Sequence, residues 1–537
     1  MRLVLTLVCV LLTSAIGAWC DEVHHHELTE QQVGSVHFET SCAKAVQPEF
    51  QRSVALLHSF QYEQARAVFQ EIAKQDPACA MAQWGIAMSH YHGLWENGDT
   101  AAGRAAITRA SQIATSSTIT ARERAYIAAL TEVYREDGKT AYEHGQGFEQ
   151  KMAELQSSYP DDTEAAIFHA LTLDIVASKT DKTFANQRKC VEILTPIFAK
   201  QPNHPGVAHY LIHCSDNPVL AESALPAARA YATIAPASAH ANHMPSHIFT
   251  RVGSWDESIR SNLRSAELAK QAESVSTNGE ARDQRLHAMD YLEYAYLQEG
   301  RVKDARAVLD QMKSLPPVPG LTLTGDYSLA AVPARYTLEL GKWEEASRLQ
   351  PLPDAVPWAQ AITWMAVGLG ASHSKDTVRA AEAEKNLARL RDAATQQKNT
   401  YWSNQIEVQR QEVAAWIMQV SGKSTEAIAT MRSAAELEES MDKSPATPGA
   451  VVPARELLAD LLQEQGHPRE ATTEYEAVLK TAPNRFNALW GAGSSAEASG
   501  NALAASKYFR KLVEVGVGSE RPELNTARKK VGTVARN

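Results

Sequence analysis

Long apolar runs and the motifs of several common enzyme classes are almost absent from this 537-residue chain. Beyond residue 18, no stretch approaches the roughly 18 uninterrupted apolar residues of a membrane-spanning helix. The sequence also contains no phosphate-binding glycine loop, no dinucleotide-binding glycine pattern, no HExxH motif and no GxSxG motif. The enzyme classes that depend on those local motifs are therefore excluded.

An excess of positive charge is missing as well. Lys and Arg total 53 against 63 Asp and Glu, which gives a formal net charge of −10, and aromatic residues make up only 7% of the chain. Because phosphate backbones and anionic membranes attract basic surfaces, we do not expect nucleic acid or an anionic membrane as the main partner. The hydrophobic fraction of 44% excludes disorder as the main state.

The start of the chain is the exception to the lack of apolar runs. Residues 3–16 are largely apolar after a single basic residue, and small residues follow near Ala18. This pattern is typical of a secretory signal peptide, so we expect one over residues 1–18. The mature protein is then exported, either periplasmic or secreted, without a transmembrane segment. An acylated Cys20 is the alternative, although Trp19 stands where a small residue is preferred.

An internal repeat organises the rest of the sequence. Two segments near the C-terminus, residues 455–483 and 487–516, align when one is shifted by 34 residues. This alignment pairs Ala471 with Ala505 and Tyr475 with Phe509. Each segment reads as two amphipathic helices joined by a turn that contains glycine. No sustained period-2 pattern indicates strands, so an all-α fold is predicted.

These segments resemble the tetratricopeptide repeat (TPR), in which small residues and one aromatic residue recur at fixed places. Similar units start at Val46, Pro205 and Leu286, and Trp343 marks another. The phrase HANHMPSHIFTRVGSWDES also resembles a group of exported bacterial TPR proteins that has no established activity. The resemblance implies a right-handed TPR-like α-solenoid whose concave groove binds a peptide or protein segment.

The repeat also predicts how the chain is divided, with residues 355–398 fitting the period poorly. After the signal peptide we expect a mobile N-terminal segment over 19–39, TPR-like repeats over 40–200, histidine-rich repeats over 201–300, further repeats over 301–517 and a tail over 518–537.

Cysteine is scarce, with six in the whole chain. Loss of Cys9 with the signal peptide leaves an odd number, and export makes disulfides permissible. Cys42 with Cys79, and Cys190 with Cys214, are plausible pairs that link neighbouring hairpins. Buried reduced thiols are the alternative, because spacing alone does not settle connectivity.

Histidine spacing carries the main functional signal. His209 and His213 are four residues apart, as are His243 and His247, and the second pair follows the first by 34 residues. Each pair therefore shares one helix face at the same place in consecutive repeats. In TPR proteins side chains at this place line the concave groove. The predicted metal ligands are His209, His213, His240, His243, His247, His287 and Asp290.

Imidazoles one helical turn apart can hold one transition metal, and a neighbouring helix can complete the ligand shell. Such a site suits Zn, Cu or Fe, whereas the oxygen cages of Ca and Mg are not indicated. A hydrogen-bonding groove for a small molecule and plain packing are the alternatives. The predicted groove residues around the site are Asp216, Tyr294, Arg335, Glu456 and Asp460.

Taken together, the sequence predicts an exported TPR-repeat protein that acts as a binding or scaffold module and carries a transition-metal site. Its partner is a peptide or protein segment in the groove, or a small molecule at the histidines. A metal-dependent hydrolase or oxidoreductase on the same solenoid is the competing function, since an open metal position activates water or dioxygen. The sequence assigns no catalytic residue.

Overall fold

The structure, a computed structural model, describes residues 29–94, 98–274, 279–318, 321–353 and 355–534. The predicted signal peptide and residues 19–28 lie outside this part of the chain. Every regular element in the described ranges is helical, and they contain no strand, which confirms the all-α prediction. Among these helices, none has both the length and the apolar character required to cross a membrane.

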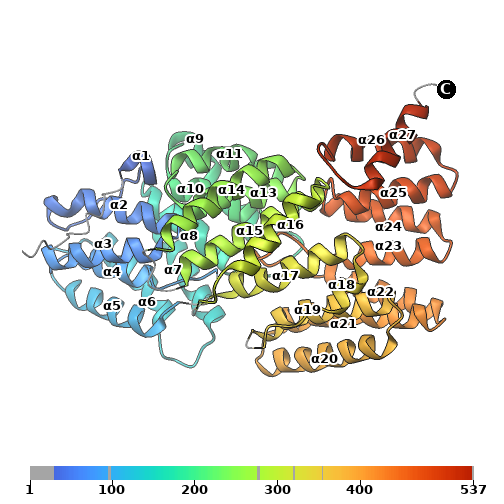
Figure 1. The fold of residues 1–537 in the computed structure, drawn as a ribbon. Helices are drawn as coiled ribbons and strands as arrows, with labels where there is room; N and C mark the ends of the chain where they lie inside the picture. Colours follow the sequence, from blue (N-terminus) through green and yellow to red (C-terminus); the bar gives the residue numbers. More distant parts are fainter. Residues whose placement is uncertain (1–28, 95–97, 275–278, 319–320, 354, 535–537) are drawn as a thin grey trace, which may run out of the picture.

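Helices that follow one another in the chain pack side by side as hairpins (Figure 1). The first third contains α1 (Glu30–Val33), α2 (Gln47–His58), α3 (Tyr62–Gln75), α4 (Ala80–Met88), α5 (Thr100–Ile113), α6 (Ala121–Thr131), α7 (Ala141–Ser158), α8 (Thr163–Ile175) and α9 (Ala185–Lys200). The middle contains α10 (Pro205–Ser215), α11 (Leu225–Ile234), α12 (Ala239–His243), α13 (Pro245–Arg251), α14 (Trp255–Ala272), α15 (Glu280–Gln298), α16 (Val302–Ser314) and α17 (Leu323–Glu339). The remainder contains α18 (Trp343–Ser347), α19 (Pro357–His373), α20 (Thr377–Gln396), α21 (Thr400–Val420), α22 (Ser424–Glu439), α23 (Ala454–Glu464), α24 (Pro468–Thr481), α25 (Phe486–Ala498), α26 (Ala502–Val515) and α27 (Pro522–Val534).

The recurring small residues let neighbouring hairpins approach closely. A Cβ on Gly85 of α4 would clash with the ring of Phe69 on α3. In the same way, a Cβ on Gly491 of α25 would clash with the ring of Tyr475 on α24. Aromatic rings thus fill the space that the glycines leave, and the repeat pattern is a packing pattern.

Residues 355–398 also form a hairpin, although they fit the 34-residue period poorly. Here α19 has 17 residues and α20 has 20, and α21 has 21. The longer helices stretch the sequence period without changing the way successive helices pack. The poor fit therefore reflects helix length, and the solenoid continues through this region.

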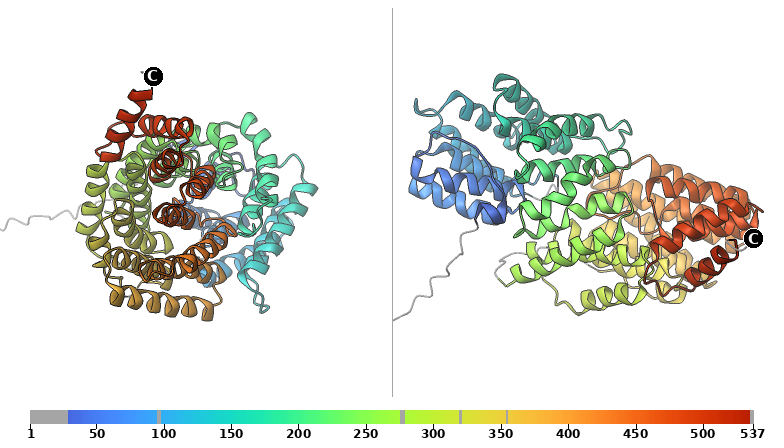
Figure 2. Two further views of the ribbon diagram at one scale, coloured as in Figure 1. Left: turned by 90° about the vertical axis from the view of Figure 1, so that its right-hand side faces the viewer. Right: turned by 90° about the horizontal axis from the view of Figure 1, so that it is seen from above.

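The solenoid curls around on itself, and its helices form a ring when seen end-on (Figure 2). Residues far apart in the chain meet where the C-terminal hairpins reach the middle helices. Trp255 Nε1 donates to the backbone oxygen of Asn484 at 3.0 Å, and Asn484 Nδ2 donates to that of Gly253 at 3.0 Å. The backbone nitrogen of Glu520 donates to Gly300 at 3.1 Å. These contacts tie the C-terminal hairpins to the middle helices.

The described part of the expected mobile segment, residues 29–39, is ordered and corrects that prediction. It forms α1 and then buries Val36 and Phe38, whose ring meets the rings of Phe50 and Tyr126. The apolar side chains complete the first hydrophobic core, so the segment is fixed by burial. At the other end, the predicted tail contains α27, which packs on α26 and caps the last hairpin.

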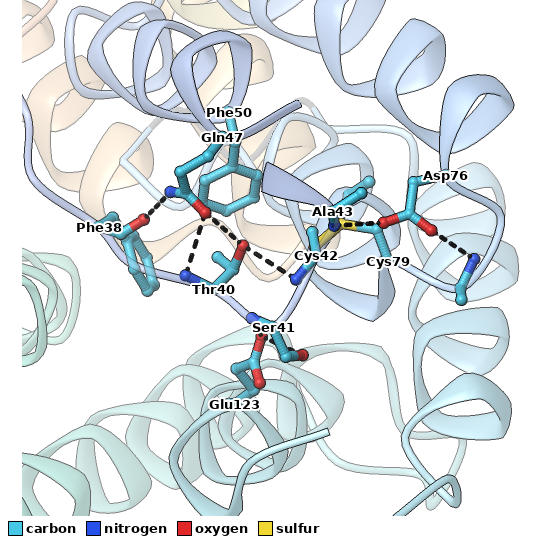
Figure 3. The surroundings of a disulfide bond; sticks show 12 residues. Phe38, Thr40, Ser41, Cys42, Ala43, Gln47, Phe50, Asp76, Cys79 and Glu123 are labelled. Carbon is cyan, nitrogen blue, oxygen red and sulfur yellow. Dashed lines mark hydrogen bonds between the residues drawn. A yellow bond between two sulfur atoms is a disulfide. The ribbon is translucent and has the colours of Figure 1, made fainter. Parts of the chain in front are cut away.

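Both predicted cysteine pairs are disulfide-bonded, Cys42 to Cys79 and Cys190 to Cys214. Around the first bridge, the backbone of Ala43 donates to Asp76, and Ser41 donates to Glu123 from both its backbone and its hydroxyl (Figure 3). The second bridge joins α9 to α10, directly beside the histidine-bearing helices.

Candidate metal centre

Six of the seven predicted ligands converge at the inner side of the solenoid. None of the six residues exposes more than 9% of its surface. The backbone of Met244 stays helical between α12 and α13, which keeps His243 and His247 one turn apart across Pro245. The six are His209 and His213 on α10, His240 and His243 on α12, His247 on α13 and His287 on α15.

The histidines form two groups of three, within each of which one ligand nitrogen per ring lies within 4.8 Å of the other two. In the first group, Nε2 of His209 is 3.0 Å from Nε2 of His240. In the second, Nε2 of His243 is 3.0 Å from Nε2 of His247. The first group is His209, His213 and His240; the second is His243, His247 and His287.

Three of these rings are held through Nδ1 by oxygen atoms. A carbonyl, amide or carboxylate oxygen only accepts hydrogen bonds, so each of these Nδ1 atoms carries the ring proton. Each neutral ring therefore presents an unprotonated Nε2. The pairs are His209 Nδ1 with the backbone oxygen of His58 at 2.6 Å, His243 Nδ1 with Asn262 Oδ1 at 2.7 Å, and His247 Nδ1 with Asp216 Oδ2 at 2.8 Å.

The pair His243 and His247 then has two nitrogen lone pairs directed at each other. The orientation of Asn262 is fixed because its Nδ2 donates to the backbone oxygen of Ser258 at 2.8 Å. With both ring protons on Nδ1, no hydrogen bond can join the two Nε2 atoms. Two nitrogens bound to one tetrahedral metal at about 2.0–2.1 Å lie about 3.3 Å apart, close to the separation seen here.

His287 adds a third ring to this group. Its ring centroid lies 4.3 Å from that of His243 and 6.0 Å from that of His247. Neither of its ring nitrogens has a hydrogen-bond partner among the described residues, although both are buried. A buried imidazole without partners loses its hydration for no compensating bond, so a ligand at this place would offset that cost.

Burial also keeps all six rings neutral. It lowers the pKa of each imidazole below the ordinary histidine value. Neighbouring rings lower the pKa further for every ring except that of His247. For His247, the Asp216 carboxylate opposes the effect of burial and raises the pKa in part. Neutral imidazole is the form that binds metals, and no proton has to be displaced from Nε2.

Asp216, predicted as a groove residue, orients the centre instead. Burial opposes its charge, yet Lys443 and Arg251 hold its pKa well below the ordinary range. Lys443 Nζ is 2.6 Å from Oδ2, and Arg251 Nε is 2.8 Å from Oδ1. The ionised carboxylate fixes the ring of His247, which is the role that outer carboxylates play around metal-binding histidines.

Residues 440–453, here called the crossing segment, run across the inner side of the solenoid between α22 and α23. The backbone nitrogen of Asp442 donates to Lys179 at 2.8 Å. Tyr291, whose ring packs on His243 and His247, donates to the backbone oxygen of Thr447 at 2.8 Å. The chain itself therefore covers the part of the groove that the sequence predicted to be open.

The remaining predicted groove residues are buried in internal bonds, which corrects the expectation of an open groove. Asp290 does not join the histidines, because Arg335 Nη1 binds it at 2.6 Å and Glu293 at 2.9 Å. The Arg335 guanidinium also lies 5.2 Å from the ring of Tyr294. Glu456 binds Arg485 at 2.7 and 2.8 Å, and Asp460 accepts from Tyr475. Curling of the solenoid brings these charges together.

Sequence reasoning missed a second buried cluster. Glu164 on α8 lies 2.9 Å from Nε2 of His58 and 2.8 Å from Nε2 of His204. Tyr210 binds the other nitrogen of His58 at 2.9 Å. The only sequence signal was the 34-residue spacing of His58 and His92, which indicated a repeat position and did not identify Glu164. This cluster is satisfied by its own hydrogen bonds.

No protein-family model matches the sequence, and no curated protein matches it either. Solved structures similar to this chain include yeast Tom70 (12% identity, 76% of this chain and 95% of that chain, TM-score 0.30). Another is a human IFIT1 dimer with PPP-AAAA, at 11% identity over 86% of this chain and 89% of that chain, with a TM-score of 0.36. A third is the P58(IPK) TPR domain, at 14% identity over 70% of this chain and 100% of that chain, with a TM-score of 0.21. The chain is thus similar to solved TPR-repeat structures, while its all-α hairpin solenoid is established by its own helices.

Proposed function

We propose that this protein is an exported TPR-type binding module whose six inner histidines hold a transition metal. One observation carries the metal assignment: Nε2 of His243 and Nε2 of His247 face each other at 3.0 Å while both ring protons are committed to oxygen acceptors. Two unprotonated nitrogens at that distance repel each other unless a cation lies between them. A proton is disfavoured by burial, which leaves a metal ion.

The chemistry of the ligands supports a late transition metal. All six ligands are imidazoles, which suit Cu, Zn or Fe and not Mg or Ca. The hydrogen bonds that the rings donate to Asp216, Asn262 and the His58 carbonyl fix the rings before a metal arrives, so little conformational entropy is lost on binding.

Burial favours binding over catalysis at this centre. A catalytic metal needs a coordination position that substrate can reach. Here the crossing segment and Tyr291 cover the second histidine group, and no ring is more than 9% exposed. Metal handling in an oxidising compartment, in storage or delivery, fits this arrangement better than turnover of a large substrate. A peptide partner would have to displace the crossing segment or dock elsewhere on the solenoid.

Elemental mass spectrometry tests the proposal on untagged mature protein purified without chelators. We expect at least near-stoichiometric metal in the wild type, and loss of the metal held by His243 and His247 in the double variant His243→Ala/His247→Ala. His373→Phe is the matched control, because His373 on α19 stacks on Trp343 of α18, away from the centre. Circular dichroism checks the fold, and His247→Gln serves if the double variant fails to fold. Metal-free wild type after reconstitution with zinc, copper and iron would refute the proposal.

A further inference from the structure

The two groups of three histidines are adjacent but separate. Within each group two Nε2 atoms are 3.0 Å apart. The ligand nitrogens of the six rings fall into these two groups, and within each group one nitrogen per ring lies within 4.8 Å of the other two. Because the ligand nitrogens gather in two groups of three, each group is suited to hold its own ion.

Each group supplies three imidazoles, enough for a three-coordinate ion or for a tetrahedral ion with one further ligand. Each also has its own outer anchor, which is the His58 backbone oxygen for His209 and the side chains of Asn262 and Asp216 for the second group. A single site with three spare histidines would need no such anchors on both sides. The duplication follows from the repeat itself, because α10 and the α12–α13 pair carry the same register of histidines.

Charge around the centre restricts which ions fit. Asp216 is the one carboxylate among the described residues that is hydrogen-bonded to the six rings, and it is already paired with Lys443 and Arg251. Asp442 binds Arg251 in turn at 3.2 Å, so these two acids and two bases sum to zero charge. The ligands themselves are neutral, so the imidazoles do not offset the charge of incoming ions.

The cost of burying an ion rises with the square of its charge. Two divalent ions would bring four uncompensated positive charges into this interior, whereas two copper(I) ions would bring two. Imidazole suits copper among the transition metals, and each group offers three imidazoles to one ion.

We infer that the two histidine groups form a paired copper(I) site that holds two ions side by side in each chain. The inference rests on the proposed function, since it specifies the number and identity of the metal ions at that same centre. It assigns one ion to His209, His213 and His240 and the other to His243, His247 and His287.

Anaerobic titration of the full mature chain with tetrakis(acetonitrile)copper(I), against bicinchoninate as a competing chelator, tests the inference. Bound copper is counted by elemental mass spectrometry. We expect two ions in the wild type and in the control His373→Phe. His240→Ala changes the first group and His287→Ala the second, and each of these variants should bind one ion. The variant that combines His240→Ala with His287→Ala should bind none. Glutamine replaces alanine where a variant does not fold.

The outcomes separate this inference from the proposed function. One copper ion per chain, abolished by either single variant, overturns the paired site and leaves the metal centre standing. Two zinc ions that copper(I) does not displace overturn the copper assignment alone. No bound metal of any kind overturns the proposed function together with the inference.

Discussion

Lys443 Nζ lies 2.6 Å from Asp216 Oδ2, although the two residues are 227 positions apart in the chain. The same carboxylate oxygen is 2.8 Å from Nδ1 of His247. The crossing segment is therefore tied by one carboxylate to the ring that faces the centre. This link between a covering segment and a metal-binding histidine underlies the first two predictions.

Lys443→Met should loosen the crossing segment, because it leaves Asp216 with Arg251 as its only basic partner. Loss of one partner of a buried, hydrogen-bonded ion pair costs about 3–5 kcal/mol. We expect faster hydrogen exchange at the amides of residues 442–447, measured by mass spectrometry. Lys511→Met, which removes a half-exposed lysine near Glu514, is the control and should leave these rates unchanged. Unaltered exchange in Lys443→Met would show that the ion pair does not hold the segment.

Asp216→Asn should weaken metal binding without removing a ligand. The amide oxygen can still accept from His247, but the ring loses the polarising charge of the carboxylate, and such changes cost about 10–100-fold in metal affinity. Competition with a chromogenic chelator measures the loss. Asp310→Asn, on the exposed face of α16, is the matched control. Equal affinity in Asp216→Asn and wild type would mean that Asp216 serves the fold alone.

Removal of each disulfide should destabilise the chain by a similar amount. The bridges close loops with sequence separations of 37 and 24 residues, for which chain entropy predicts about 3.5–4 kcal/mol each. Urea unfolding of Cys42→Ala/Cys79→Ala and of Cys190→Ala/Cys214→Ala measures the effect. Only the second variant should also lower metal affinity, since its bridge anchors α10, which carries His209. Equal metal affinity in both variants would contradict that link.

Asp460 should make stability fall as pH rises from 4 to 7. Burial and the nearby Glu456 raise its pKa from 3.8 to about 7. Between those values the folded chain binds a proton that the unfolded chain releases, so the free energy of unfolding falls by about 1.4 kcal/mol per pH unit. Stabilisation is complete below the unfolded pKa and is lost above the folded one. In Asp460→Asn the side chain does not titrate, so this contribution to the pH dependence of the free energy of unfolding is absent.

Thermal unfolding of wild type and Asp460→Asn at pH 5, 6, 7 and 8 measures the effect. The wild-type midpoint should drop relative to that of the variant as pH rises to 7, and the difference should level off above it. Asp310→Asn, whose carboxylate is half-exposed, should keep a constant difference from wild type. Parallel curves for wild type and Asp460→Asn would refute the protonated state of Asp460.

The amino-acid sequence by itself determined the helices, the hairpins and the register of the histidines. Ala471 over Ala505, and His209 over His243, follow from a 34-residue period that is contained within two neighbouring hairpins. Helical periodicity then places His209 and His213 on one face. Such relations depend on contacts within tens of residues, and local patterns predict them well.

Only the tertiary structure decided which partners the side chains of those residues bind. Asp290 was predicted to bind metal and instead binds Arg335, while Lys443, which no pattern singled out, reaches Asp216. The pitch of the superhelix sets these contacts. The pitch is the sum of the small packing angles between many successive hairpins. No short stretch of sequence specifies that sum. The sequence therefore predicted the histidine cluster, whereas the cover over it and the division into two groups depended on how the solenoid closes.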